Sequence, residues 1–141
     1  QISLFEDIPA GLPALAKSQK LQRRAARMGF DWPSVEPILD KVDEELVELR
    51  AEIEGAPAPG MEQRRFEEFG DVLFVMVNLG RRLGIDAEAA LRAANTKFTR
   101  RMDSMAAQAR ESGHVLDSMT LDQMQVLWDR AKDAERGKGR A

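Results

Sequence analysis

The sequence predicts an all-α protein folded as a helical bundle of four to five helices. Its 141 residues are rich in alanine, leucine, glutamate and arginine, which favour helices, and contain few runs of β-branched residues. Apolar residues recur at offsets of three and four over long stretches, which is the spacing of an amphipathic helix. No stretch shows a convincing strand alternation.

Most of the expected helices have a start or stop signal of their own. Pro13 suits the first turn of the first helix, and Asp86 is a good N-cap for the fourth. Thr120 and Gln123 have the spacing of a capping box at the start of the last helix. The expected helices cover residues 13–28, 35–54, 62–83, 87–111 and 121–134.

Length and composition narrow the class of protein. The chain suits one domain over residues 11–134, with an N-terminal arm or linker at 1–10 and a flexible tail at 135–141. A net charge of −3 predicts no nucleic-acid partner, and no apolar run approaches the roughly 20 residues that span a bilayer, so no membrane partner is expected either. The lack of cysteine fits a reducing cytoplasm.

The first expected helix is strongly basic. Its cations are Lys17, Lys20, Arg23, Arg24 and Arg27. A solvent-exposed face is the simpler interpretation, and a wall that faces phosphate groups is the alternative.

The stretch from Phe66 to Leu83 is apolar on most faces, which predicts a helix in the middle of a core. Its polar exceptions Glu68, Asp71, Asn78 and Arg82 fall along one edge of that helix. A buried Asp71 needs a compensating charge, and no lysine or arginine lies one turn away from it. A metal ion is one candidate for that charge.

Acidic pairs on two successive helices predict a metal site. Glu45 and Glu48 lie three residues apart, as do Glu68 and Asp71, and the loop from Gly55 to Gly60 makes the two helices antiparallel neighbours. Four converging carboxylates repel one another unless hard divalent cations lie between them. Oxygen ligands without cysteine or a helical histidine favour Mg²⁺, with Mn²⁺ as the alternative.

Basic side chains on the expected helices complete the chemistry of this site. Lys41, Lys97 and Arg101 are suited to holding the phosphates that share the coordination shell of Mg²⁺. The acidic pattern of Glu44, Glu45 and Glu48 alone is common on solvated helices and carries little weight. The combination of both pairs with nearby cations indicates phosphoryl chemistry.

Several segments resemble the MazG nucleoside triphosphate pyrophosphohydrolases. The resemblance covers about residues 11–132 and is closest to the catalytic second repeat of the longer bacterial MazG proteins. It is carried by the two acidic motifs and by GFDWPSV at residues 29–35, GDVLFVMVNLGRRLGID at 70–86 and ANTKFTRRM at 94–102. This chain has one repeat rather than two, so the regulation that a first repeat would provide is not assumed.

The resemblance implies an all-α NTP pyrophosphatase fold, commonly a homodimer, that hydrolyses an NTP or dNTP to the monophosphate and pyrophosphate with Mg²⁺. Glu44 or Glu48 would accept the proton of the attacking water. The implied metal ligands are Glu45, Glu48, Glu68 and Asp71. The implied substrate contacts are Lys41, Asn95, Lys97 and Arg101 at the phosphate side, with Trp128 packed on the base, although Trp128 also has the spacing of an ordinary core residue.

Three other interpretations stay open from the sequence. A narrower dUTP or dCTP hydrolase or a phosphoribosyl-ATP pyrophosphatase would share the same site. A di-iron oxidoreductase normally needs Glu-x-x-His on two helices, whereas the single histidine, His114, falls in an expected loop. A non-enzymatic helical interaction module would bind neither metal nor nucleotide.

Overall fold

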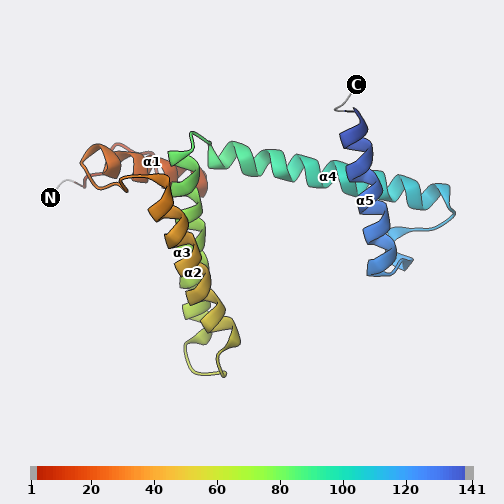
Figure 1. Cartoon of the computed structure of the whole chain (residues 1–141), viewed down its shortest axis with the longest axis horizontal. Helices are drawn as coiled ribbons and strands as arrows, with labels where there is room; N and C mark the ends of the chain where they lie inside the picture. The colour runs from red at the N-terminus through yellow and green to blue at the C-terminus, as the bar shows by residue number, and fades with distance from the viewer. Residues whose placement is uncertain (1–2, 139–141) are drawn as a thin grey trace. The chain divides into compact units, whose positions relative to one another are not determined.

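The computed structural model describes residues 3–138 and is helical throughout (Figure 1). The described residues contain no strand, which confirms the predicted all-α class. None of their helices is long and apolar enough to cross a membrane. The elements are α1 (Ala14–Arg27), α2 (Val35–Glu54), α3 (Met61–Arg82), α4 (Ala87–Glu111), the short 3₁₀ helix η1 (Leu116–Ser118) and α5 (Leu121–Lys138).

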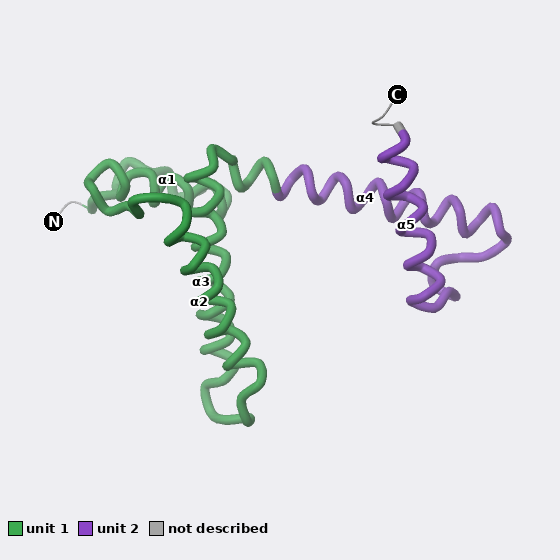
Figure 2. Tube along the Cα trace, in the orientation of Figure 1, with its two compact units in different colours: residues 1–90 green, residues 91–141 purple. Residues whose placement is uncertain are grey.

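The chain divides into two compact units, residues 1–90 and residues 91–141 (Figure 2). Helix α4 begins in unit 1 and continues in unit 2. The predicted domain limits at residues 11 and 134 stay a prediction. Helix α5 includes the first four residues of the expected tail, while residues 1–2 and 139–141 lie outside the described part of the chain.

Unit 1 is built on an antiparallel hairpin of α2 and α3, which lie side by side along most of their length (Figure 1). Ile38 of α2 is fully buried, and Val75 and Val77 of α3 are almost completely buried. Arg65 donates hydrogen bonds to the carbonyls of Glu52 and Ile53 at 2.9 and 3.1 Å. These carbonyls belong to the last turn of α2, where the helix itself supplies no donors, so Arg65 stabilises the hairpin at its loop end.

Helix α1 packs against α3 through a polar contact as well as an apolar one. Gln22 is buried and donates a hydrogen bond from Nε2 to the Phe74 carbonyl at 3.0 Å. The same amide donates to Ser18 one turn earlier in α1 at 3.2 Å. The bond to the Phe74 carbonyl joins the two helices and helps to set how α1 is rotated on α3, whereas Gln22 Oε1 is buried without a partner among the described residues.

The expectation that α3 lies in the middle of a core is wrong for this chain. Phe66 is 74% exposed, Phe69 56% and Met76 46%. Within unit 1, helices α1 and α2 cover only part of the circumference of α3. Unit 1 therefore presents a broad apolar surface along α3.

The turn between α1 and α2 is held to the end of α3 by one carboxylate. Asp31 forms ion pairs with Arg81 and Arg82 and accepts a hydrogen bond from the backbone N–H of Trp32. Burial opposes ionisation of this carboxyl, but the hydrogen bonds from Arg81 and Trp32 and the charge of the two arginines keep its pKa below the usual value. Trp32 is held at the surface of unit 1, 38% exposed.

Unit 2 contains α5 and the part of α4 that follows Ala90. These two helices pack together through Met105, Ala109 and Leu127. The predicted capping box at the start of α5 is confirmed, since Gln123 N–H donates to Thr120 Oγ1 at 3.2 Å and Thr120 N–H donates to Gln123 Oε1 at 2.9 Å. In unit 1 the Asp86 carboxylate caps α4 as predicted, accepting from the Ala89 N–H at 3.1 Å.

Candidate active site

Three acidic side chains of unit 1 converge between α2 and α3. Glu45 and Glu48 come from consecutive turns of α2, and Glu68 comes from α3. Each places a carboxylate oxygen so that the three oxygens lie within 4.8 Å of one another. The antiparallel hairpin creates this arrangement, because it sets the inner edge of α2 against the inner edge of α3.

Two of the converging carboxylates have oxygens that no group of the described residues satisfies. Glu45 is only 7% exposed, and its Oε2 is buried without a hydrogen-bond partner. The Oε2 of Glu68 is likewise buried and unpartnered. A buried carboxylate oxygen with no donor is strongly destabilising, so the protein alone leaves this cluster incomplete. The donor set, made of carboxylate oxygens only, fits a hard divalent cation such as Mg²⁺ or Mn²⁺.

Lys41 lies at one side of the cluster and compensates part of its charge. Its Nζ is 3.1 Å from Glu44 Oε1 and 3.2 Å from Glu45 Oε1. The hydrogen bonds to Glu44 and then to Glu45 raise the pKa of Lys41 above its usual value. Lys41 therefore remains a cation next to the place where the sequence predicts a phosphate group.

Two of the predicted acidic residues lie outside the group of three. Asp71 is exposed, so the expectation of a buried Asp71 that lacks a counter-charge is wrong. It is one turn from Glu68 on α3, and its role as a metal ligand stays a prediction. Glu44 is also exposed and is bound to Lys41 instead of joining Glu45, Glu48 and Glu68.

The other predicted substrate residues all belong to unit 2. Asn95 and Lys97 are exposed on α4, and their role stays a prediction. Arg101 stacks over the Trp128 ring, with Cζ 5.0 Å from the ring centroid. Phe98 lies against the same ring at a centroid distance of 5.9 Å. Trp128 also packs on the core of unit 2, so its indole has a structural role whether or not a base contacts it.

Sequence reasoning missed the partner of Arg101. The Glu135 carboxylate accepts hydrogen bonds from Arg101 at 3.0 and 3.1 Å and from Arg100 at 3.1 Å. Glu135 is the first residue of the predicted flexible tail. Its distance of seven residues from Trp128, two turns along one helix face, was the available signal. The hydrogen bonds to Glu135 thus hold the Arg101 guanidinium in place over the Trp128 indole.

Comparison with known proteins identifies the relatives of this chain. It is 41% identical over 135 residues to the nucleoside triphosphate pyrophosphohydrolase of Escherichia coli strain K12. It is 37% identical over 124 residues to the nucleoside triphosphate pyrophosphohydrolase/pyrophosphatase MazG of Thermotoga maritima. The chain is a homologue of MazG. The aligned regions cover 96% and 88% of the chain, so the MazG similarity includes both units.

The similarity to MazG proteins covers only a part of each relative. The chain spans about half the length of the MazG relatives, with 51% of the Escherichia coli protein and 46% of the Thermotoga maritima protein aligned. It also matches 27% of the Bacillus subtilis uncharacterized protein YabN at 44% identity over 134 residues. No protein-family model matches the chain.

We expect metal binding by this MazG homologue to depend on Glu68. Replacing Glu68 by glutamine should weaken Mn²⁺ binding by at least about tenfold, because the charge of an oxygen ligand is lost. The same change should raise the melting temperature in EDTA, since it relieves repulsion with Glu45. Electron paramagnetic resonance titration measures the first effect and circular dichroism the second.

Glu67→Gln is the matched control for this prediction. Glu67 is the exposed neighbour of Glu68 on α3 and accepts a hydrogen bond from Gln63 at 3.1 Å. This variant loses the same charge one residue away and should bind Mn²⁺ as the unchanged protein does. Equal Mn²⁺ affinity in the Glu67→Gln and Glu68→Gln variants would contradict the assignment of Glu68.

The pair between Glu135 and Arg101 should make stability depend on pH in acid. Hydrogen bonds from Arg101 and then Arg100 lower the pKa of Glu135 below 4.5, its usual value. The stabilisation is therefore complete above pH 4.5 and is lost as the pH falls through the lowered pKa. Urea denaturation from pH 7 to pH 3 should show Glu135→Gln less stable at neutral pH and level with the unchanged protein in acid.

Asp133→Asn serves as the control for that measurement. Asp133 is exposed on the same helix and forms no ion pair with any described residue. Its replacement should leave the pH dependence of the free energy of unfolding as it was. A difference between the Glu135→Gln variant and the unchanged protein that persists unchanged at pH 3 would rule out the ion pair as its cause.

Proposed function

We propose that this chain is a metal-dependent nucleoside triphosphate pyrophosphohydrolase that converts an NTP or dNTP to the monophosphate and pyrophosphate. The observation that carries the proposal is the group of Glu45, Glu48 and Glu68, with two buried oxygens for which residues 3–138 supply no donor. The names of the MazG relatives support the same reaction. A cytoplasmic location stays a prediction.

The charge and the exposure of each residue indicate its proposed role in the site. Glu45 and Glu68 would hold the cation, since their free oxygens point into the interior. When bound, Mg²⁺ supplies Lewis-acid polarisation of the phosphoryl group and neutralises charge on the leaving pyrophosphate. Lys41 stays protonated beside Glu45 and would contact a phosphate oxygen. The exposed Asp71 would join as a further ligand from the solvent side.

The proposed step is attack of water on the α-phosphorus. The bond from that phosphorus to the oxygen bridging the α- and β-phosphates breaks, and pyrophosphate leaves. A carboxylate accepts the proton of the water. Glu48 suits this better than Glu44, because an oxygen of Glu44 already accepts a hydrogen bond from the Lys41 ammonium.

Hydrolysis in ¹⁸O-labelled water tests the reaction and its position. Each common NTP and dNTP is incubated with the chain and Mg²⁺, and the products are analysed by mass spectrometry. We expect the label in the monophosphate and none in pyrophosphate. Label that appears only in orthophosphate would overturn the proposal, and activity confined to dUTP, dCTP or phosphoribosyl-ATP would assign the narrower enzyme class.

We also propose that two copies of the chain associate through the apolar surface of α3. Monomeric proteins rarely leave a contiguous apolar surface of this kind in water. Phe66, Phe69, Leu73 and Met76 fall at successive helical offsets and are all exposed. A second copy of the same helix would cover them by the same packing that α2 and α3 use within the chain.

Replacing Phe66 by lysine should therefore produce a monomer. Sedimentation equilibrium should give twice the chain mass of 15.8 kDa for the unchanged protein and the single mass for the variant. Leu121→Lys is the control, because Leu121 is 78% exposed on α5 and lies outside the α3 surface. A single mass for the unchanged protein would refute the proposed association.

A further inference from the structure

Helix α1 has a charge composition unlike that of the rest of the chain. Its 14 residues carry five of the 21 cationic side chains and none of the 24 acidic ones. The whole chain nevertheless has a net charge of −3. Such a concentration of positive charge costs free energy by self-repulsion and attracts anions. The proposed hydrolysis at α2 and α3 uses none of these five residues.

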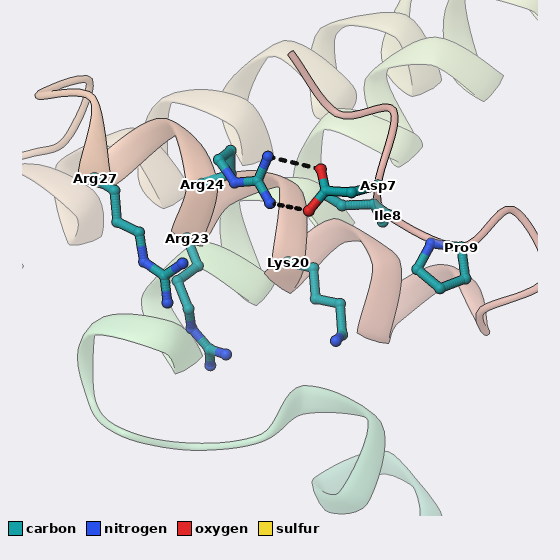
Figure 3. Close-up of a pocket in the computed structure, with 7 residues that line it drawn as sticks. All are labelled: Asp7, Ile8, Pro9, Lys20, Arg23, Arg24 and Arg27. Carbon is teal, nitrogen blue, oxygen red and sulfur yellow. Dashed lines mark hydrogen bonds and ion pairs between the residues drawn. The ribbon is translucent and has the colours of Figure 1, made fainter. Parts of the chain in front are cut away.

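Four of these cations line a pocket beside the N-terminal segment, and Arg24 is the one among them that is paired with a carboxylate (Figure 3). Lys20, Arg23 and Arg27 lie along one stripe of α1, since their offsets are three and four. Their ends point the same way in Figure 3. All three are exposed, and no carboxylate of the described residues forms an ion pair with any of them.

The one acidic residue of the pocket is already paired. Asp7 accepts two hydrogen bonds from the Arg24 guanidinium, at 2.9 Å and 2.6 Å. The hydrogen bond from Arg24 is the main reason that the pKa of Asp7 lies below its usual value. Arg24 also donates to the Leu4 carbonyl at 2.9 Å, so the N-terminal segment is fastened to α1. With Asp7 and Arg24 cancelling each other, the pocket keeps the charge of its three other cations.

The size of the pocket limits what it can hold. Its volume is about 150 Å³, whereas sites for drug-sized ligands measure roughly 300–1,000 Å³. A phosphate or pyrophosphate group fits this volume, and a whole nucleotide does not. An anionic membrane surface is disfavoured, because a helix that binds membranes buries its own apolar face in lipid and α1 packs against α3.

We propose that Lys20, Arg23 and Arg27 form a binding site for a small phosphate-bearing anion of the phosphate or pyrophosphate class, apart from the acidic cluster. The guanidinium groups of Arg23 and Arg27 suit two-pronged hydrogen bonding to phosphate oxygens, and Lys20 adds a third donor. The site shares no residue with Glu45, Glu48 or Glu68. It therefore does not depend on the hydrolase activity proposed above.

Calorimetric titration with pyrophosphate in EDTA tests this proposal. Without a divalent cation the acidic cluster repels pyrophosphate, so binding reports on α1 alone. The double variant Lys20→Ala/Arg23→Ala should bind pyrophosphate about tenfold more weakly, since each exposed ion pair is worth a few-fold in affinity. Titrations with phosphate and with AMP show whether a free anion or the phosphate group of a nucleotide is preferred. Whichever of the two ligands binds more tightly, loss of its binding in the Lys20→Ala/Arg23→Ala variant supports the site.

A second double variant separates the site from general charge. Arg110→Ala/Arg136→Ala removes two exposed positive charges from α4 and α5. Neither residue lines the pocket on α1. It should bind pyrophosphate as the unchanged protein does. Equal losses in the two double variants, or no saturable binding by the unchanged protein, would overturn the proposal. So would tighter binding of DNA or phosphatidylserine vesicles than of pyrophosphate through the same residues.

A Glu45→Gln/Glu68→Gln variant keeps this result distinct from the proposed enzyme activity. It removes the acidic cluster and should still bind pyrophosphate in EDTA at least as well as the unchanged protein. Loss of binding in that variant would assign pyrophosphate to the acidic cluster and refute the site on α1.

Discussion

The packing of α2 against α3 decides where the acidic side chains of unit 1 meet. Ile38 of α2 and Val75 and Val77 of α3 are buried in unit 1, and Arg65 holds the loop end of the hairpin by bonding to the last carbonyls of α2. The same contact forces Glu45 and Glu68 together with buried, unpartnered oxygens. Apolar burial must offset the repulsion between them, so the hairpin sustains a site that is unfavourable for the protein by itself.

Local signals account for most of the secondary structure. The period of apolar residues located all five helices, and the capping residues Asp86 and Thr120 gave the starts of α4 and α5. These features depend on groups a few residues apart, so a single sequence contains the required information. The exposure of Phe66 and Phe69 is not a local property, because it depends on which other elements cover α3. The apolar pattern of α3 is the same whether these side chains are covered or exposed.

The acidic site was predictable in part for a related reason. A short loop between two helices makes them antiparallel, and this was enough to bring Glu45 and Glu48 near Glu68. The rotation of each helix about its own axis decides which further side chains reach the site. That rotation leaves Asp71 facing solvent and is set by packing, including the bond from Gln22 to the Phe74 carbonyl, which the sequence pattern does not specify.

The two tryptophans of the chain fall one in each unit, and this gives each unit its own fluorophore. Trp32 is at the surface of unit 1, next to the Asp31 carboxylate that binds Arg81 and Arg82. Trp128 is half-buried in unit 2 beneath the Arg101 guanidinium. A pair of single-tryptophan proteins would therefore follow the melting of residues 1–90 and 91–141 as separate optical signals, without any added dye.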